Sequence, residues 1–248
     1  MRKTVVAVLF ALLAGACSEP SPPPSFGDAR ALADAATAAT ASGGSAKFGT
    51  HVAVGAIRSK GQGQARFGAG GTAQVMTTDV LGEPMELRLV GGKLYAKVPE
   101  GSRDEMGAGK PWVAVAADGT DPFSQVLGGS LTQLAAQNDP AHTLGEIRTA
   151  GTIVSAERTQ LGGVAAEHYR VNLDLARLGT DLPAGLPPES AGRLGRFPVE
   201  LWLDDTHRPL QIVLDLSPIL QGEARITTRY TEWGAPVDVQ PPPAGEVG

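Results

Sequence analysis

The sequence has one cysteine, Cys17, in 248 residues. A single cysteine excludes a disulfide within the chain and any metal site built from several thiolates. Histidine is nearly as rare. The four histidines, His51, His142, His168 and His207, lie far apart, so none forms the helical pair of an H-E-x-x-H zinc site. We therefore expect neither a metal centre nor another bound cofactor.

The sequence also lacks the short motifs of nucleophilic and phosphate chemistry. Ser130 follows two glycines, but no G-x-S-x-G nucleophile elbow is present. The glycine-rich run at residues 68–71 lacks the lysine of a phosphate-binding loop. Asp204 and Asp205 are adjacent acids in a turn, which is weak support for a cation site. Because no catalytic hypothesis has more than one element, we predict that the protein is not an enzyme.

Basic residues are in the minority. The chain carries 21 Lys and Arg against 26 Asp and Glu, a formal net charge of -5. A mildly acidic surface disfavours nucleic acid as a partner and gives no electrostatic attraction to anionic lipid. We therefore expect any membrane contact to come through an anchor.

Such an anchor is indicated at the N-terminus. Two basic residues precede an apolar run at residues 5–13, which is shorter than the ~20 residues that span a bilayer. The small residues A-G-A lead directly to Cys17, as in the lipobox of bacterial lipoproteins. Ala14 stands where this motif usually has leucine, so cleavage by an ordinary signal peptidase stays open. We predict a signal peptide at 1–16, a diacylglycerol thioether on Cys17, and a domain on the extracytoplasmic face of the cell membrane.

Proline and glycine divide the mature chain into three parts. Residues 17–26 contain the run S-E-P-S-P-P-P-S, which predicts a stiff tether with a rise of ~3.1 Å per residue. Residues 240–248 form a second segment rich in proline and glycine, which we expect to be disordered. Residues 27–239 lie between them, and their number suits one large β-rich domain.

Within this domain the pattern predicts one helix followed by a long series of strands. Residues 28–41 are alanine-rich and begin with Asp28, a good N-cap. Helical spacing recurs at 122–137 and in one turn at 175–178, whereas 139–145 show no pattern. The expected strands are 48–57, 62–67, 72–78, 84–90, 93–98, 112–116, 151–161, 164–173, 197–204, 209–216 and 224–233. Short glycine turns join most of them, which favours an antiparallel sheet.

Apolar and polar side chains alternate along several of these strands, as in M-E-L-R-L at 85–89. Side chains alternate faces with a period of two, so the sheet has one aliphatic side. The helical segments that could cover this side are few and rich in small residues. The pattern alone does not separate a lined cavity from a packed core, and a packed core is the commoner outcome.

Several segments together resemble the LppX/LprA/LprF/LprG family of actinobacterial lipoproteins. They are the lipobox with its tether, the alanine-rich first helix, the hairpin V-G-G-K-L-Y at 90–95, Trp112, the hairpin at 151–173, the segments V-E-L-W-L-D and R-P-L within 199–210, and the ending Y-T-E-W-G-A-P-V at 230–237. The resemblance covers nearly the whole mature chain. Its most specific parts are the strand–turn–strand at 201–210 and the terminal W-G-x-P-V.

The resemblance implies a strongly curved antiparallel half-barrel, similar to the LolA/LolB-type carriers, with helices on its concave side around a hydrophobic cavity. It implies that the protein binds acylated lipids or glycolipids there and helps to transfer them across the cell envelope. A membrane transporter is a further candidate partner, and we expect a monomer. The alternative is a protein–protein interaction module without lipid cargo, for which Trp202 and Trp233 are the candidate anchors.

The candidate lining residues are aliphatic, as an acyl chain requires. From the strands they are Val52, Val54, Val75, Met85, Leu87, Leu89, Leu94, Val171, Leu201, Leu203, Ile212, Leu214 and Ile226. From the helical side they are Leu127, Leu131 and Leu134. The long loop at 179–196 is the candidate rim of the cavity. Its Arg193 and Arg196 are candidate contacts for a phosphate or sugar headgroup, with solvated surface charges as the alternative.

Overall fold

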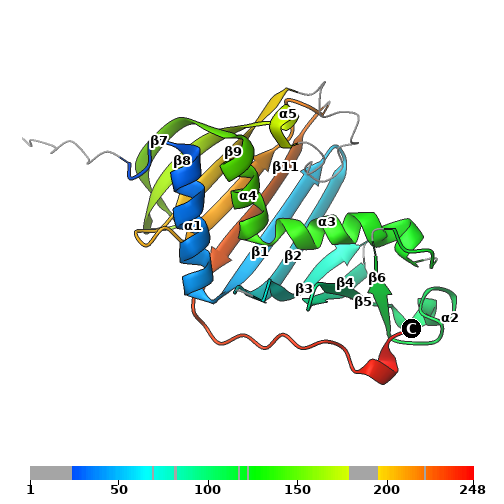
Figure 1. Cartoon of the computed structure of the whole chain (residues 1–248). Coiled ribbons are helices and arrows are strands. Elements are labelled where there is room, and N and C mark those ends of the chain that lie inside the picture. The colour runs from blue at the N-terminus through cyan, green and yellow to red at the C-terminus, as the bar shows by residue number, and fades with distance from the viewer. Residues whose placement is uncertain are drawn as a thin grey trace, which may run out of the picture.

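The computed structural model describes residues 24–68, 70–80, 83–116, 118–121, 123–178, 195–220 and 222–248. Its main element is one antiparallel sheet of eleven strands in the order β6-β5-β4-β3-β2-β1-β11-β10-β9-β8-β7. The sheet is strongly curved and stays open, with β6 and β7 at its two edges (Figure 1). The α+β half-barrel predicted from the sequence is therefore confirmed.

The strands follow the predicted segments closely. They are β1 (Ser45–Val54), β2 (Ile57–Arg66), β3 (Ala73–Val80), β4 (Glu83–Val90), β5 (Lys93–Lys97), β6 (Trp112–Val115), β7 (Gly151–Leu161), β8 (Val164–Asp174), β9 (Arg196–Leu203), β10 (Pro209–Asp215) and β11 (Ala224–Thr231). The hairpins β4–β5 and β7–β8 each turn on two glycines with positive φ, at 91–92 and 162–163. Two-residue hairpin loops of this type need positive φ, which glycine adopts without steric cost.

The helices lie between the strands and before β1. They are α1 (Ala29–Gly43), α2 (Arg103–Met106), α3 (Gly129–Gln137), α4 (Pro140–Ala150) and α5 (Leu175–Leu178), with short turns η1 (Glu100–Ser102), η2 (Ser124–Gly128) and η4 (Ala244–Glu246). Asp28 caps α1 as predicted, because its carboxylate accepts hydrogen bonds from the backbone N–H groups of Arg30 and Ala31. Gly44 ends the helix with φ 72°.

Helix α4 corrects one expectation, since residues 139–145 read as irregular in the sequence. Asp139 is the N-cap of α4, and its side chain accepts a hydrogen bond from the N–H of Ala141. Pro140 occupies the first helical position, where the missing N–H costs nothing. Pro140 therefore begins a helix within a segment that shows no pattern in the sequence.

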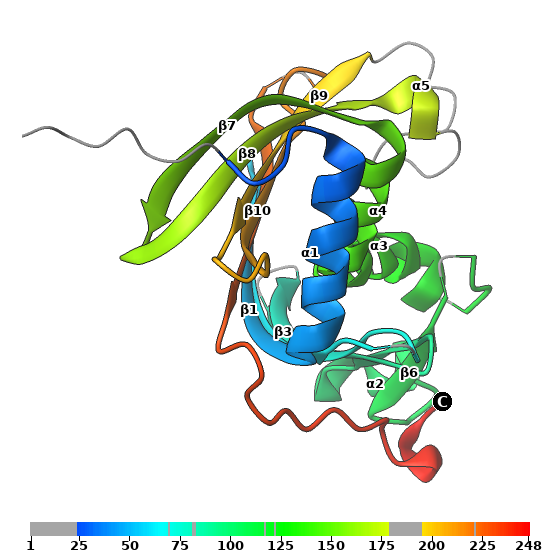
Figure 2. The same ribbon diagram turned by 60° about the vertical axis from the view of Figure 1, so that its left-hand side comes forward.

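Helices α1, α3 and α4 form one layer on the concave side of the sheet (Figures 1 and 2). We call this side the inner face and the opposite side the outer face. Helices α1 and α4 pack against each other, and α4 also packs on β7 and β8. Helix α1 contributes buried alanines with Leu32 at the contact, which keeps this cover thin. Among the described residues, none of the helices has the length and apolar character needed to cross a membrane.

The C-terminal segment corrects the expectation that residues 240–248 are disordered. From the end of β11 it runs along one border of the sheet to the edge strand β6 (Figure 1). Arg88 donates a hydrogen bond to the carbonyl of Gln240 at 3.3 Å, and Lys110 donates one to the carbonyl of Gly245 at 2.8 Å. Val247 then pairs with Trp112 of β6. Proline removes N–H donors but keeps carbonyl acceptors, so side chains of the sheet hold this proline-rich segment.

Candidate functional site

The register of the sheet decides which candidate residues lie on the inner face. All but one of the strand candidates lie there and belong to one continuous apolar cluster with the helices. They are Val52, Val54, Met85, Leu87, Leu89, Leu94, Val171, Leu201, Leu203, Ile212, Leu214 and Ile226. Of the helical candidates, Leu131 is buried, while Leu127 and Leu134 are half-buried against the same cluster.

Val75 is the exception, and its assignment to the concave face is wrong. It pairs with Gln64 of β2 and Arg88 of β4, which lie on the outer face, whereas its neighbour Met76 is buried on the inner face. Val75 and Met76 are both apolar, so alternation could not decide which of them faces inward. The hydrogen-bonded register of β3 decides it.

Side chains occupy the space in which a hydrophobic cavity was predicted. Leu201, Leu203 and Val171 are 0% exposed and Leu87 is 1% exposed. Much of the filling comes from aromatic residues of the strands, which are the largest fully buried side chains together with Phe123. These inward aromatics are Tyr169, Phe197 and Tyr230. The small residues of the helices suggested unfilled space, but the volume of these aromatic rings fills it.

A polar cluster lies where α3 meets the inner face, and sequence reasoning missed it. At its centre is Asn138, which ends α3 and is 0% exposed. Thr50 of β1 donates a hydrogen bond to Oδ1 of Asn138, and Nδ2 of Asn138 donates one to Sδ of Met76 at 3.0 Å. The hydroxyl of Tyr230 donates to the backbone carbonyl of Asn138 at 3.2 Å. Strands β1, β3 and β11 thus hold the C-terminal end of α3.

Two polar atoms beside this cluster have no partner. Within the described residues, Oε1 of Gln74 on β3 and Oγ1 of Thr132 on α3 are buried and accept or donate no hydrogen bond. The amide nitrogen of Gln74 does donate to the carbonyl of Ala135 on α3, at 2.7 Å. A buried polar group without a partner costs about 1–3 kcal/mol. The contact between α3 and the sheet is therefore weaker than a fully satisfied one.

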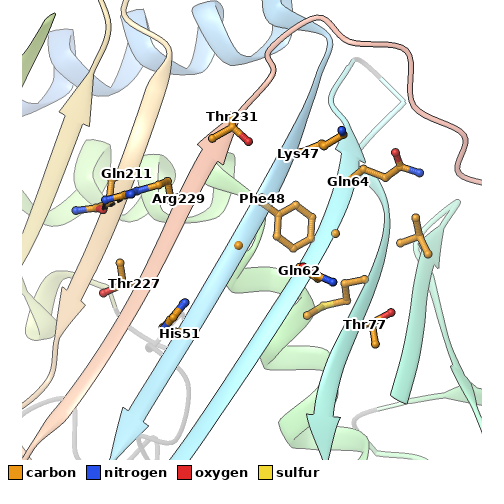
Figure 3. A pocket seen from close by; sticks show the side chains of 14 residues that line it. Lys47, Phe48, His51, Gln62, Gln64, Thr77, Gln211, Thr227, Arg229 and Thr231 are labelled. Carbon is orange, nitrogen blue, oxygen red and sulfur yellow. Dashed lines mark hydrogen bonds between the residues drawn. The ribbon is translucent and has the colours of Figure 1, made fainter. Parts of the chain in front are cut away.

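An open pocket of about 850 Å³ lies on the outer face, over β1, β2, β3, β10 and β11 (Figure 3). Gly49 at its centre has no side chain, so the longer side chains around it form a rim. The polar lining residues are Lys47, His51, Gln62, Gln64, Thr77, Gln211, Thr227, Arg229 and Thr231. The sequence shows these residues only as the wet positions of alternating strands, and nothing in it indicated a hollow.

The outer pocket combines apolar residues, among them Phe48 and Val75, with polar and cationic side chains, and no carboxylate lines it. Arg229 donates to Oε1 of the buried Gln211 at 3.3 and 3.0 Å, which orients its guanidinium. Lys47 pairs with Glu232 at 2.7 Å on the exposed surface. The side chains of His51 and Gln62 make no hydrogen bond within the described part of the chain. The polar part of this lining suits a hydroxylated or anionic group.

The remaining predicted residues lie away from both sites or outside the described residues. Arg196 begins β9, is exposed and pairs with Asp174 at 3.4 Å. Arg193 and Cys17 lie outside the described residues. Trp202 stacks on His168 on the outer face with ring centroids 4.1 Å apart, and Trp233 packs on Phe67 and Tyr230. In the described ranges, no three side chains of the metal-ligating types come together.

No protein-family model matches the sequence, and no curated protein shows a significant match. Among solved structures, LprF from Mycobacterium bovis aligns over 86% of this chain and 96% of its own, with a TM-score of 0.52 and 15% sequence identity. The chain has the fold of LprF. At this identity the likeness to LprF concerns the fold alone, and it confirms the fold that the sequence resemblance implied.

Two further solved structures are less similar than LprF. MucB in complex with MucA(peri) aligns over 86% of this chain and 58% of its own, with a TM-score of 0.43 and 15% identity. The Pseudomonas aeruginosa MucA/MucB complex aligns over 82% and 56%, with a TM-score of 0.39 and 17% identity. At these TM-scores they carry no argument about this chain.

Proposed function

We propose that the protein is a membrane-anchored extracytoplasmic lipoprotein that binds acylated lipids or glycolipids between α3 and the inner face, and helps to transfer them across the cell envelope. The observation that carries the proposal is the inner face itself, on which aliphatic side chains of both halves of the sheet form one apolar cluster. An acyl chain of sixteen carbons in water costs on the order of 12 kcal/mol, at ~0.8 kcal/mol per CH₂. A protein that offers such a surface outside the bilayer lowers the barrier to transfer.

Binding requires that part of the inner cover moves, because side chains fill the interior. Helix α3 is the part of the cover that we expect to move. Gln74 of β3 and Thr132 of α3 have unpartnered buried atoms, and Leu134 of α3, like Leu127 of the preceding η2, is only half-buried. An acyl chain that replaces the contacts of α3 would bury this half-covered apolar surface, while the Asn138 cluster keeps the C-terminal end of the helix on the sheet.

The alternative function, a protein–protein module without lipid, has less support. Its candidate anchors are already engaged within the chain. Trp202 lies flat on His168, and the indole N–H of Trp233 donates to the carbonyl of Pro209 at 3.0 Å. The likeness to LprF favours neither function by itself, and the apolar inner face is what supports lipid binding.

Lipid loading is tested with two matched valines. Val52 on β1 faces inward and Val75 on β3 faces outward, and both are half-buried. The chain with Cys17→Ser, exported with its leader and purified without detergent, should carry acylated lipid that native mass spectrometry detects. Burying a valine contributes about 1.5–3 kcal/mol, so Val52→Gln should lower the lipid content roughly threefold or more, and Val75→Gln should leave it unchanged.

Two results would contradict the proposal. One is that the Cys17→Ser protein with both valines intact carries no acylated lipid and takes up none from vesicles. The other is an equal effect of the two substitutions, which would mean that the inner face is not the binding surface. Urea unfolding of both variants controls for a general loss of stability.

Anchoring at Cys17 is a separate part of the proposal. The short leader, the small residues before Cys17 and the absence of another cysteine support it. We expect the unsubstituted protein in the membrane fraction of cells and the Cys17→Ser variant in the soluble extracytoplasmic fraction, with equal amounts of folded protein. A Cys17→Ser protein that stays with the membrane would refute the anchor.

A further inference from the structure

The N-terminal chain joins the domain at a defined point on β8. Glu167 accepts hydrogen bonds from the N–H and the hydroxyl of Ser25, at 3.2 and 2.8 Å. The N–H of Phe26 donates to the hydroxyl of Tyr169 at 3.2 Å, and the Phe26 ring contacts the ring of His207 at 5.0 Å. These contacts fix where the segment that precedes α1 leaves the domain.

The distance from this point to the expected anchor is short. Ser25 follows Cys17 by eight residues. A chain of that length reaches no farther than about 28 Å even when fully extended. Whatever its conformation, a lipidated Cys17 therefore keeps the Glu167 side of the domain close to the membrane surface.

The β7–β8 hairpin ends beside this attachment point. Arg158 pairs with Glu167 at 3.0 Å, and the eight residues between them, T-Q-L-G-G-V-A-A at 159–166, carry no charge. Val164 precedes Glu167 by three residues, or about 10 Å of strand. Figures 1 and 2 both place the free end of this hairpin on the same side of the molecule as the chain that leads into α1.

Val164 is unusually exposed for its type. Among the described residues, the large apolar side chains that stand exposed are Val154 at 56% and Val164 at 49%. Both lie on this hairpin, and only Val164 lies at its tip. An exposed aliphatic side chain next to a glycine turn, within a segment that itself carries no charge, is compatible with the apolar boundary of a bilayer.

From these observations we infer that the tip of the β7–β8 hairpin, residues 159–166, rests in the surface of the membrane that holds the anchor. The inference rests on the proposed anchoring at Cys17 and does not depend on lipid cargo. Since the tip carries no charge, the contact is apolar and insensitive to salt. Docking would fix the orientation of the half-barrel toward the bilayer from which lipid is taken.

The test attaches the chain that begins at Cys17 to vesicles through its only thiol. The vesicles contain zwitterionic phosphatidylcholine, a maleimide lipid for coupling, and a phosphatidylcholine with brominated acyl chains that quenches tryptophan at short range. The variant Val164→Trp places an indole at the tip. Val154→Trp is the matched control, because it is equally exposed on the same strand pair but about 23 Å of strand away from the turn.

We expect brominated lipid to quench at least half of the fluorescence that Val164→Trp adds to the unsubstituted protein, at both low and high salt. The fluorescence added by Val154→Trp should stay unchanged. Equal quenching of both indoles, or quenching of neither, would overturn the docking inference, as would quenching that salt abolishes. Circular dichroism confirms that each variant is folded.

This experiment separates the inference from the proposed function. Coupling through the thiol replaces biological lipidation, so the result stands whether or not Cys17 is modified in cells. Lipid loading is measured on protein without an anchor, so an empty interior leaves the docking result intact. A docked hairpin on a protein that never carries lipid would support the inference and refute the carrier.

Discussion

Asn138 shows how one polar residue can organise an apolar layer. It lies between α3 and α4, and its side chain bonds to strands β1 and β3 while its carbonyl accepts from β11. The hydroxyls of Thr50 and Thr228 lie 3.2 Å apart beside it and extend the cluster. A buried amide is stable only where its donors and acceptors are satisfied. Asn138 therefore defines one position for the end of α3 on the sheet.

We expect Asn138→Ala to lower the free energy of unfolding by about 1–3 kcal/mol, because the Thr50 hydroxyl loses its main partner while staying buried. Urea unfolding followed by circular dichroism measures this loss. Gln133→Ala, at an exposed position of α3, is the control and should change stability by less than about 0.5 kcal/mol. An Asn138→Ala protein as stable as the control would show that α3 is held by apolar contacts alone.

The identities of neighbouring residues also explain which side chains of the interior could be predicted from the sequence and which could not. Alternation assigned most of the aliphatic candidates to the inner face, on which the register also places them. It could not place Val75, whose neighbour Met76 is equally apolar. Nor could it show that Tyr169 and Tyr230 belong to the same buried cluster, since this depends on contacts between strands distant in the sequence.

At the scale of elements, short-range signals were sufficient for most of the fold. The glycine pairs at 91–92 and 162–163 indicated the two tight hairpins, and Asp28 indicated the start of α1. The segments that were mispredicted share a high proline content or a proline at a helix start. Composition suggested disorder for 240–248, but the hydrogen bonds from Arg88 and Lys110 that hold this segment come from residues far away in the chain.

The outer pocket also depends on how neighbouring strands are paired. It exists because β1 places Gly49 between the longer side chains of β2 and β11. Each strand viewed alone shows an ordinary wet face. Only the cross-strand register brings the amide of Gln62 opposite Gly49 and the guanidinium of Arg229 on its other side. A hollow of this kind cannot be read from one strand.

At the scale of the whole molecule, several carboxylates link stability to pH. Burial alone would raise the pKa of Glu167, but hydrogen bonds from Tyr169 and Ser25 and the charge of Arg158 outweigh it and lower the pKa. Burial would also raise the pKa of Asp204, but hydrogen bonds from Thr206 and Arg208 outweigh this effect and lower the pKa. These groups bind protons less readily in the folded chain than in the unfolded chain.

A lowered carboxylate pKa contributes stability above the unfolded value, about 4, and this stability is lost as the pH falls through the folded value. We expect the free energy of unfolding to change little between pH 7 and pH 5 and to drop steeply below pH 4. Urea unfolding across this range measures it. Glu167→Gln should be less stable at pH 7 and lose less on acidification. A protein that gains stability below pH 4 would contradict this assignment.

The strand order also determines how this sheet can be assembled. Every ladder of the described sheet except β1–β11 joins strands that follow one another in the chain. The chain thus forms two meanders, β1–β6 and β7–β11, which can grow from local hairpins, whereas their junction closes nearly the whole intervening length. Until β11 arrives, β1 is a free edge with unpaired backbone groups, the type of strand that captures other chains. The aggregation hazard of this protein therefore lies at β1 in the half-assembled chain, before the junction closes.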